Sequence, residues 1–112
     1  MRRSRDTVQT SLAWARALRA AALLLNREVC RYVMACRADL SADHRRHLMN
    51  LSARSWDEAC DLYSADIWDH FEIDEVELRR RAPQLARLRM AGRVADAAAA
   101  EREALRRALS AA

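Results

Sequence analysis

The sequence is poor in the residues that interrupt helices, since its 112 residues include one Gly and one Pro. Lys is absent, so that all 20 basic residues are Arg, and aromatic residues make up only 5% of the chain. A single Gly excludes a glycine-rich phosphate-binding loop and argues against β-sandwich and dinucleotide-binding folds. Ala, Leu and Arg fill about half of the chain, a composition that is typical of long helices.

The chain also lacks the patterns of secreted and membrane-spanning proteins. Its three cysteines, Cys30, Cys36 and Cys60, are odd in number and form no Cys-x-x-Cys motif, which favours a reducing compartment such as the cytoplasm. Arg16 and Arg19 interrupt the apolar run near the N-terminus. We therefore expect neither a signal peptide nor the run of about 20 apolar residues that a transmembrane segment needs.

Apolar residues recur at helical spacing from about Thr7 to Asp39. One series lies seven residues apart, and a second follows it three residues later: Val8, Ala15, Ala22, Val29 and Cys36, with Leu18, Leu25 and Tyr32. The pattern predicts an N-terminal tail over residues 1–6 and a first helical arm over residues 7–51. A helix over the periodic stretch would be about 50 Å long. We expect its apolar stripe to need cover from outside the chain.

A turn is predicted at residues 52–55. Ser41 offers an N-cap for a short segment that ends near this turn. Ser55 and Glu58 then match a capping box, in which the two side chains satisfy each other's free backbone N–H groups. The pattern therefore predicts that a second helix begins at Ser55.

The second helix is expected to extend over residues 55–81. Pro83 disfavours helical geometry at Ala82, so we expect a break or a kink there. Residues 83–112 are rich in Ala and Arg and predict a C-terminal helix that is partly frayed. The chain is thus predicted to form one all-α domain over residues 1–112, a helical hairpin or coiled-coil-like bundle without strands.

Charge is distributed in blocks along the chain. Residues 1–56 carry eleven Arg against four acidic residues, residues 57–77 carry nine acidic residues and no Arg, and residues 78–112 carry nine Arg against three acidic residues. Such blocks favour antiparallel pairing of helices, within a chain or between chains. The basic patch Arg79, Arg80 and Arg81 could alternatively meet nucleic-acid phosphates, although the neighbouring acidic block would repel them.

Candidate catalytic and metal-binding residues are few. His44 and His47 could share one helix face, but they lack the further ligands that a metal site needs. His70 lies one helical turn from Asp66 and Asp74, a spacing that is typical of a local salt bridge. The carboxylates are spread evenly and are not paired in contrasting environments, as acid and base catalysts are. We expect no enzyme activity, no cofactor and no metal.

The segment from Asn26 to Arg80 resembles the phasin family, small helical proteins that coat polyhydroxyalkanoate storage granules in bacteria. The resemblance is carried by NREVCRYVMACRADL (26–40), HRRHLMNL (44–51), SARSWDEACDL (52–62) and YSADIWDHFEIDEVELRR (63–80). Phasins have a long amphipathic helix, a turn of the small-Arg/Lys-Ser-Pro-x-Glu-Ala kind, and a second amphipathic helix with central aromatic residues. Here the motif Arg54-Ser55-Trp56-Asp57-Glu58-Ala59 occupies the turn, with Trp56 in the place of Pro.

The resemblance implies a non-catalytic coat protein at the granule surface in the cytoplasm. The predicted contact residues share the 3–4 spacing of the two helices: Leu18, Leu25, Val29, Tyr32, Trp56, Tyr63, Ile67 and Phe71. Because the same stripe drives self-association, we expect a homo-oligomer whose partners are the granule surface or another helical protein. Two alternatives stay open: a structural or adaptor bundle that acts through self-association or a protein partner, and an Arg-rich nucleic-acid-binding regulator.

Overall fold

The computed structural model describes residues 2–62 and 70–111 of the chain. The elements are α1 (Arg2–Cys36), α2 (Ala42–Leu62), β1 (Phe71–Ile73), α4 (Glu75–Met90), α5 (Val94–Ala108) and β2 (Leu109–Ala111). Helices dominate the described residues, which confirms the predicted all-α class. The prediction of no strand is wrong, since β1 and β2 form a small antiparallel sheet.

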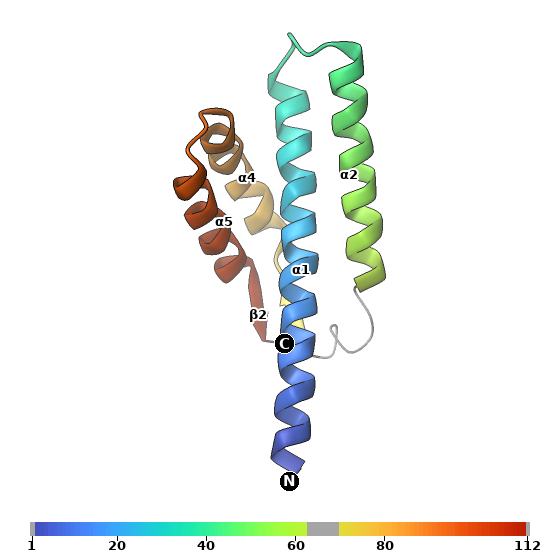
Figure 1. Ribbon diagram of the computed structural model, residues 1–112, viewed down its shortest axis with the longest axis vertical. Coiled ribbons are helices and arrows are strands. Elements are labelled where there is room, and N and C mark those ends of the chain that lie inside the picture. Colours follow the sequence, from blue (N-terminus) through green and yellow to red (C-terminus); the bar gives the residue numbers. More distant parts are fainter. Residues whose placement is uncertain (1, 63–69, 112) are drawn as a thin grey trace.

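Helix α1 is the central element of an elongated molecule that measures 58 × 26 × 20 Å. Helix α2 packs antiparallel along one side of α1, and the α4–α5 hairpin packs on another side (Figure 1). The N-terminal end of α1 projects beyond α2, α4 and α5. With 35 residues α1 is about 50 Å long, which accounts for the longest dimension.

The chain reverses direction between α1 and α2, at residues 37–41. The hydroxyl of Ser41 accepts a hydrogen bond of 3.1 Å from the backbone N–H of His44, so the predicted N-cap at Ser41 is confirmed. The Arg45 guanidinium donates to the carbonyl oxygens of Met34 (3.1 Å) and Arg37 (3.2 Å). These bonds satisfy carbonyl groups at the C-terminal end of α1, where the helix itself supplies no donor.

Several predicted boundaries differ from the structure. Residues 2–6 belong to α1 and not to a tail, and the predicted arm 7–51 is divided at residues 37–41. Helix α2 continues through residues 52–55, so the predicted turn is wrong and Ser55 lies inside a helix instead of capping one. Ser inside a helix costs only about 0.5 kcal/mol, and the packing of α2 along α1 outweighs it.

The predicted second helix over 55–81 and C-terminal helix over 83–112 are also wrong as single units. Pro83 lies inside α4 instead of breaking it. A proline there removes a backbone hydrogen bond and costs about 3 kcal/mol. The buried side chains around it, among them Ala82, Leu85 and Ala86, offset this cost by packing in the core.

The actual break separates α4 from α5 at Gly92. Its φ of +70° lies in the left-handed region that residues with a Cβ rarely adopt, which explains why the only Gly of the sequence stands here. Helix α4 begins at an N-cap, Asp74, whose side chain accepts a hydrogen bond of 3.1 Å from the N–H of Glu77. The end of the predicted C-terminal helix is a strand, β2.

The small sheet closes over the N-terminal half of α1. Phe71 is paired with Ala111 and Ile73 with Leu109, and Phe71 and Leu109 pack with Ala13 and Ala17 of α1. A larger core joins α1 to α4 and α5, with Leu25, Leu78 and Leu85 as its largest fully buried side chains. Many of the other buried residues are alanines, whose small side chains let the helices approach closely.

Candidate interaction surface

The structure buries part of the predicted contact stripe inside the chain. Leu25 is fully buried, and Val29 and Phe71 are also buried, so in this fold they are core residues and not contacts for an external surface. Leu25 and Val29 are buried because the α4–α5 hairpin covers the α1 stripe that we expected to need an outside partner. Phe71 is covered by its own sheet and by α1.

The other predicted contact residues divide into three groups. Leu18 and Tyr32 are half-buried at the margins of the two core clusters. Tyr63 and Ile67 lie outside the described residues. Trp56 alone among those described is exposed, with 42% of its surface accessible.

Helix α2 is covered on one side only. It packs against α1 and makes no comparable contact with the other described helices. Ala59 is its one buried residue, while Leu48, Leu51 and Leu62 are half-buried. Met49, which is 57% exposed, and Trp56 lie seven residues apart and thus on one face of the helix. We call the exposed stripe of Met49, Ala53 and Trp56 the outer face of α2.

The Trp56 ring is held in place from α1. The guanidinium carbon of Arg27 lies 4.6 Å from the ring centroid, a cation–π contact worth about 0.5–1 kcal/mol at an exposed site. Close by, Arg19 of α1 and Glu58 of α2 form an ion pair of 3.7 Å. The indole is therefore fixed at the edge of the α1–α2 seam while much of its surface stays accessible.

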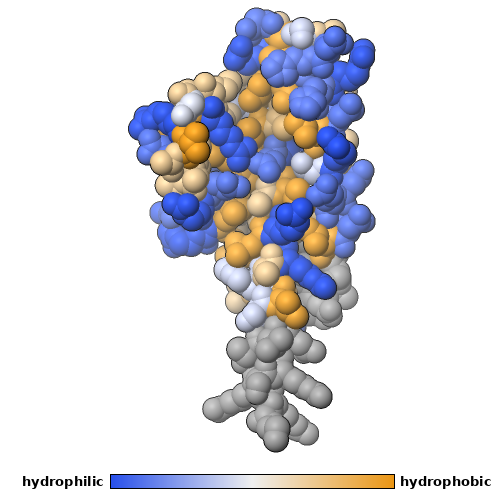
Figure 2. Space-filling view, in the orientation of Figure 1, coloured by the Kyte–Doolittle hydropathy of each residue, from blue (hydrophilic) through white to orange (hydrophobic). Residues whose placement is uncertain are grey.

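Other exposed apolar side chains are dispersed. Leu12 and Trp14 are exposed in the N-terminal half of α1, and the Trp14 ring meets Phe71 of the small sheet edge-on at 5.3 Å. Val76, Met90 and Val94 are exposed on or beside the α4–α5 hairpin. Figure 2 shows hydrophilic residues over much of this view, with hydrophobic residues gathered along its middle, over α1.

The arginines of the predicted basic patch pair with carboxylates of the same chain. Arg80 and Arg81 both pair with Glu77, at 3.4 and 2.9 Å, and Arg79 pairs with Glu28 at 3.6 Å. The Glu28 side chain is only 8% exposed and also lies within 4 Å of two arginines of its own helix. Arg79 thus links α4 to α1, while Arg80 and Arg81 pair within α4.

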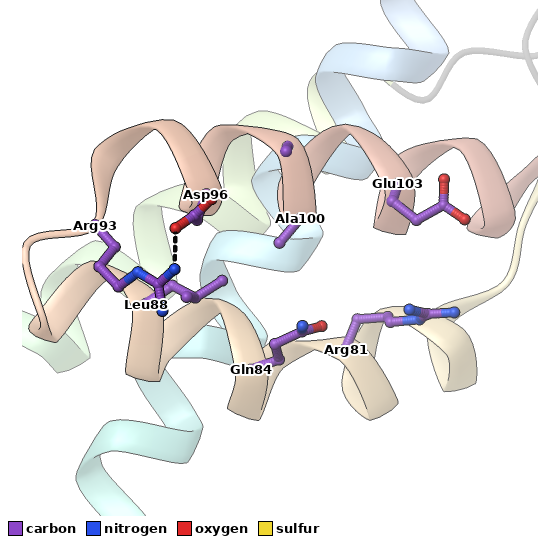
Figure 3. A pocket seen from close by; sticks show the side chains of 8 residues that line it. Arg81, Gln84, Leu88, Arg93, Asp96, Ala100 and Glu103 are labelled. Atoms are coloured by element: carbon purple, nitrogen blue, oxygen red, sulfur yellow. Dashed lines mark ion pairs between the residues drawn. The ribbon is translucent and has the colours of Figure 1, made fainter.

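A groove of about 460 Å³ lies between α4 and α5 (Figure 3). Its charged lining residues already have partners: Arg81 pairs with Glu77, Arg93 with Asp96, and Glu103 with two arginines of the last turn. Their hydrogen bonds lower the pKa of Glu103 from 4.5 to about 2. The groove therefore presents paired charges and no acid and base in contrasting environments.

The remaining titratable groups of the described residues are one partly buried thiol and three exposed histidines, besides groups already paired or at the surface. Burial raises the pKa of the Cys30 thiol, which keeps it protonated and weakly nucleophilic at neutral pH. His44, His47 and His70 are exposed. Within residues 2–62 and 70–111 no three His, Cys, Asp or Glu side chains are grouped to bind a metal ion. No helix in the same ranges is both long and apolar enough to cross a membrane.

The chain matches no family model, no curated protein and no solved structure. The resemblance to phasins therefore stays a prediction. The geometry defines the protein as an all-α helical bundle with a closed alanine- and leucine-rich core. Two exposed apolar side chains, Met49 and Trp56, lie together on the outer face of α2, and Arg27 holds the Trp56 ring in place.

Proposed function

We propose that this protein is a non-catalytic helical adaptor, which acts by binding another protein chain through the outer face of α2. One observation supports the proposal above all: a helix of 21 residues has a single buried residue, while Met49 and Trp56 stay exposed. Surface helices gain their stability by burying an apolar stripe, at about 25 cal/mol per Å². A partner that covers Met49 and Trp56 would complete the burial of α2.

The chemistry of the charged groups favours binding over catalysis. The carboxylates and arginines of the α4–α5 groove are engaged with one another, and the one thiol with a shifted pKa is shifted away from reactivity. Trp is also the residue type that most often dominates the binding energy of protein interfaces. Arg27 has already fixed the Trp56 ring, so that binding would cost little side-chain entropy.

Photo-crosslinking in the producing cell tests this proposal. A photoreactive amino acid replaces Ala53, at the centre of the outer face, or Arg102, which is also exposed, on α5. We expect a covalent protein adduct from position 53 and little or none from position 102. Equal adducts from both positions, or none from position 53, would contradict the proposal.

A second candidate function is that of a phasin-like coat on polyhydroxyalkanoate granules in the cytoplasm. It is favoured by Leu12 and Trp14, which are exposed in the N-terminal half of α1. A helix with apolar side chains on one face can lie along a hydrophobic surface. This function would use the end of α1, and not the buried residues Leu25 and Val29.

Partition of the labelled protein between cytosol and isolated granules tests the second candidate. We expect Leu12→Asp to reduce the granule-bound fraction, and Val94→Asp, at an exposed site on the opposite part of the molecule, to leave it unchanged. If the wild-type protein does not bind polyhydroxyalkanoate beads, either bare or lipid-coated, this second function is wrong.

A further inference from the structure

The outer face of α2 is symmetric about the centre of the helix. The midpoint of Ala42–Leu62 is residue 52. The two exposed apolar residues, Met49 and Trp56, lie three residues before it and four residues after it. Arg46 lies six residues before the midpoint and Asp57 five residues after it, and both are exposed. Among these four residues, Met49 thus matches Trp56 across the centre and Arg46 matches Asp57.

Helical geometry places these residues in two parallel rows. Seven residues at 100° each fall 20° short of two turns, so Met49 and Trp56 form one row. Eleven residues exceed three turns by 20°, so Arg46 and Asp57 form a second row, which lies beside the first on the side away from α1. The buried Ala59 marks the opposite flank, where α2 meets α1.

The charge of α2 reverses along its length. Arg45 and Arg46 stand in the first half with one acidic residue, and the second half carries three acidic residues and one arginine. Parallel pairing of two such helices would bring like charges together, whereas antiparallel pairing brings opposite charges together. A two-fold axis perpendicular to the helix uses the same surface on both copies and is the commonest symmetry of protein dimers.

We infer that the protein partner of α2 is a second copy of this chain, bound antiparallel about a two-fold axis that crosses the helix at the level of residue 52. The inference rests on the proposed function, because it names the chain that covers the outer face. In this arrangement Met49 packs against the partner's Trp56, a contact between a thioether and an aromatic ring. Arg46 faces the partner's Asp57, with an offset of about 1.5 Å along the helix axis.

Sedimentation equilibrium of the full chain with a charge swap tests the inference. The single variants Arg46→Asp and Asp57→Arg should each weaken dimerisation about tenfold, because each dimer contains the altered contact twice. The double variant Arg46→Asp with Asp57→Arg should restore the affinity to within about threefold of the parent, because the swap recreates both pairs. Far-UV circular dichroism verifies that every variant is folded.

Two further variants distinguish this contact from nonspecific hydrophobic association. Met49→Glu should weaken the dimer more than tenfold, because it places a charge against an apolar ring. Val94→Glu, at the exposed end of the α4–α5 hairpin, should leave it unchanged. Both changes add the same charge, so only their position differs.

Three results would overturn the inference: a parent chain that stays monomeric at hundreds of micromolar, single variants that dimerise like the parent, or a double variant as weak as the two single changes combined. The proposed function has its own test. If the chain is monomeric and position 53 nevertheless crosslinks to a different protein, the second copy is wrong as the partner and the adaptor function stands. If the chain is monomeric and position 53 gives no adduct, both fail.

Discussion

Replacement of Leu25 by Ala tests whether the apolar stripe of α1 is an internal core. The Leu25 side chain has no exposed surface and lies in the cluster that also contains Leu78 and Leu85. The removed atoms forfeit about 2 kcal/mol of transfer free energy, and the cavity that remains adds about 1 kcal/mol or more. We therefore expect Leu25→Ala to lower the free energy of unfolding by about 3 kcal/mol, a large fraction of the stability of a domain of this size.

Urea denaturation followed by circular dichroism measures this effect. With a denaturant slope of about 1.5 kcal/mol per M, the unfolding midpoint should fall by about 2 M. The matched control is Leu12→Ala, at a site on the same helix that is 59% exposed, where we expect a change of less than about 0.5 kcal/mol. If both variants shift the midpoint equally, Leu25 is not covered by α4 and α5, and the stripe is available to an outside partner after all.

Three further predictions concern the charged and capping groups. Glu28→Gln should destabilise the fold by about 1–2 kcal/mol in the same urea assay, because it removes a nearly buried carboxylate that links the arginines of α1 to α4. Asp74→Ala should cost about 1 kcal/mol through loss of the α4 N-cap, and Asp74→Asn should restore most of it. Because two arginines lower the pKa of Glu103 to about 2, its ionised form stabilises the fold above about pH 4.5, and this contribution is lost as the pH falls through 2. Between pH 4.5 and pH 2, the melting temperature of Glu103→Gln should therefore fall less than that of the parent protein. An equal fall in both proteins would show that the ion pairs of Glu103 contribute nothing to stability.

The sequence predicts which face of a helix is apolar better than it predicts which element covers that face. The periodic positions of α1 identify Leu25 and Val29 as members of an apolar stripe, and both are buried. Periodicity does not say what covers a stripe, and here the cover comes from α4 and α5, whose own apolar residues are largely alanines. Alanines give a weak periodic signal, although their small size is what allows the close packing.

Local signals predict some boundaries and fail at others for one physical reason. Ser41 caps α2 as predicted, because no tertiary contact competes with the hydrogen bond that its hydroxyl makes. Ser55 and Pro83 carry equally strong local signals, but both lie inside helices that pack against α1. Where many side chains are buried, packing outweighs a local cost of about 0.5 to 3 kcal/mol.

The sequence predicts only part of the candidate surface. Trp56 belongs to the predicted contact set and is exposed, but its neighbour on the outer face, Met49, was missed. The spacing of seven residues between them is visible in the sequence. The predicted turn at residues 52–55 separated them, so the two-fold pattern about residue 52 emerges only when α2 is one continuous helix.

Hydrogen–deuterium exchange of the intact chain at low and high concentration tests most directly whether the outer face of α2 is the contact surface. The core segment of α1 around Leu25 should exchange slowly at both concentrations, because it is covered within the chain. Backbone amides of α2 from Met49 to Cys60 should exchange more slowly at the higher concentration, while those of α5 stay unchanged. Exchange in α2 that is independent of concentration, or protection that increases in α5 instead, would contradict the account.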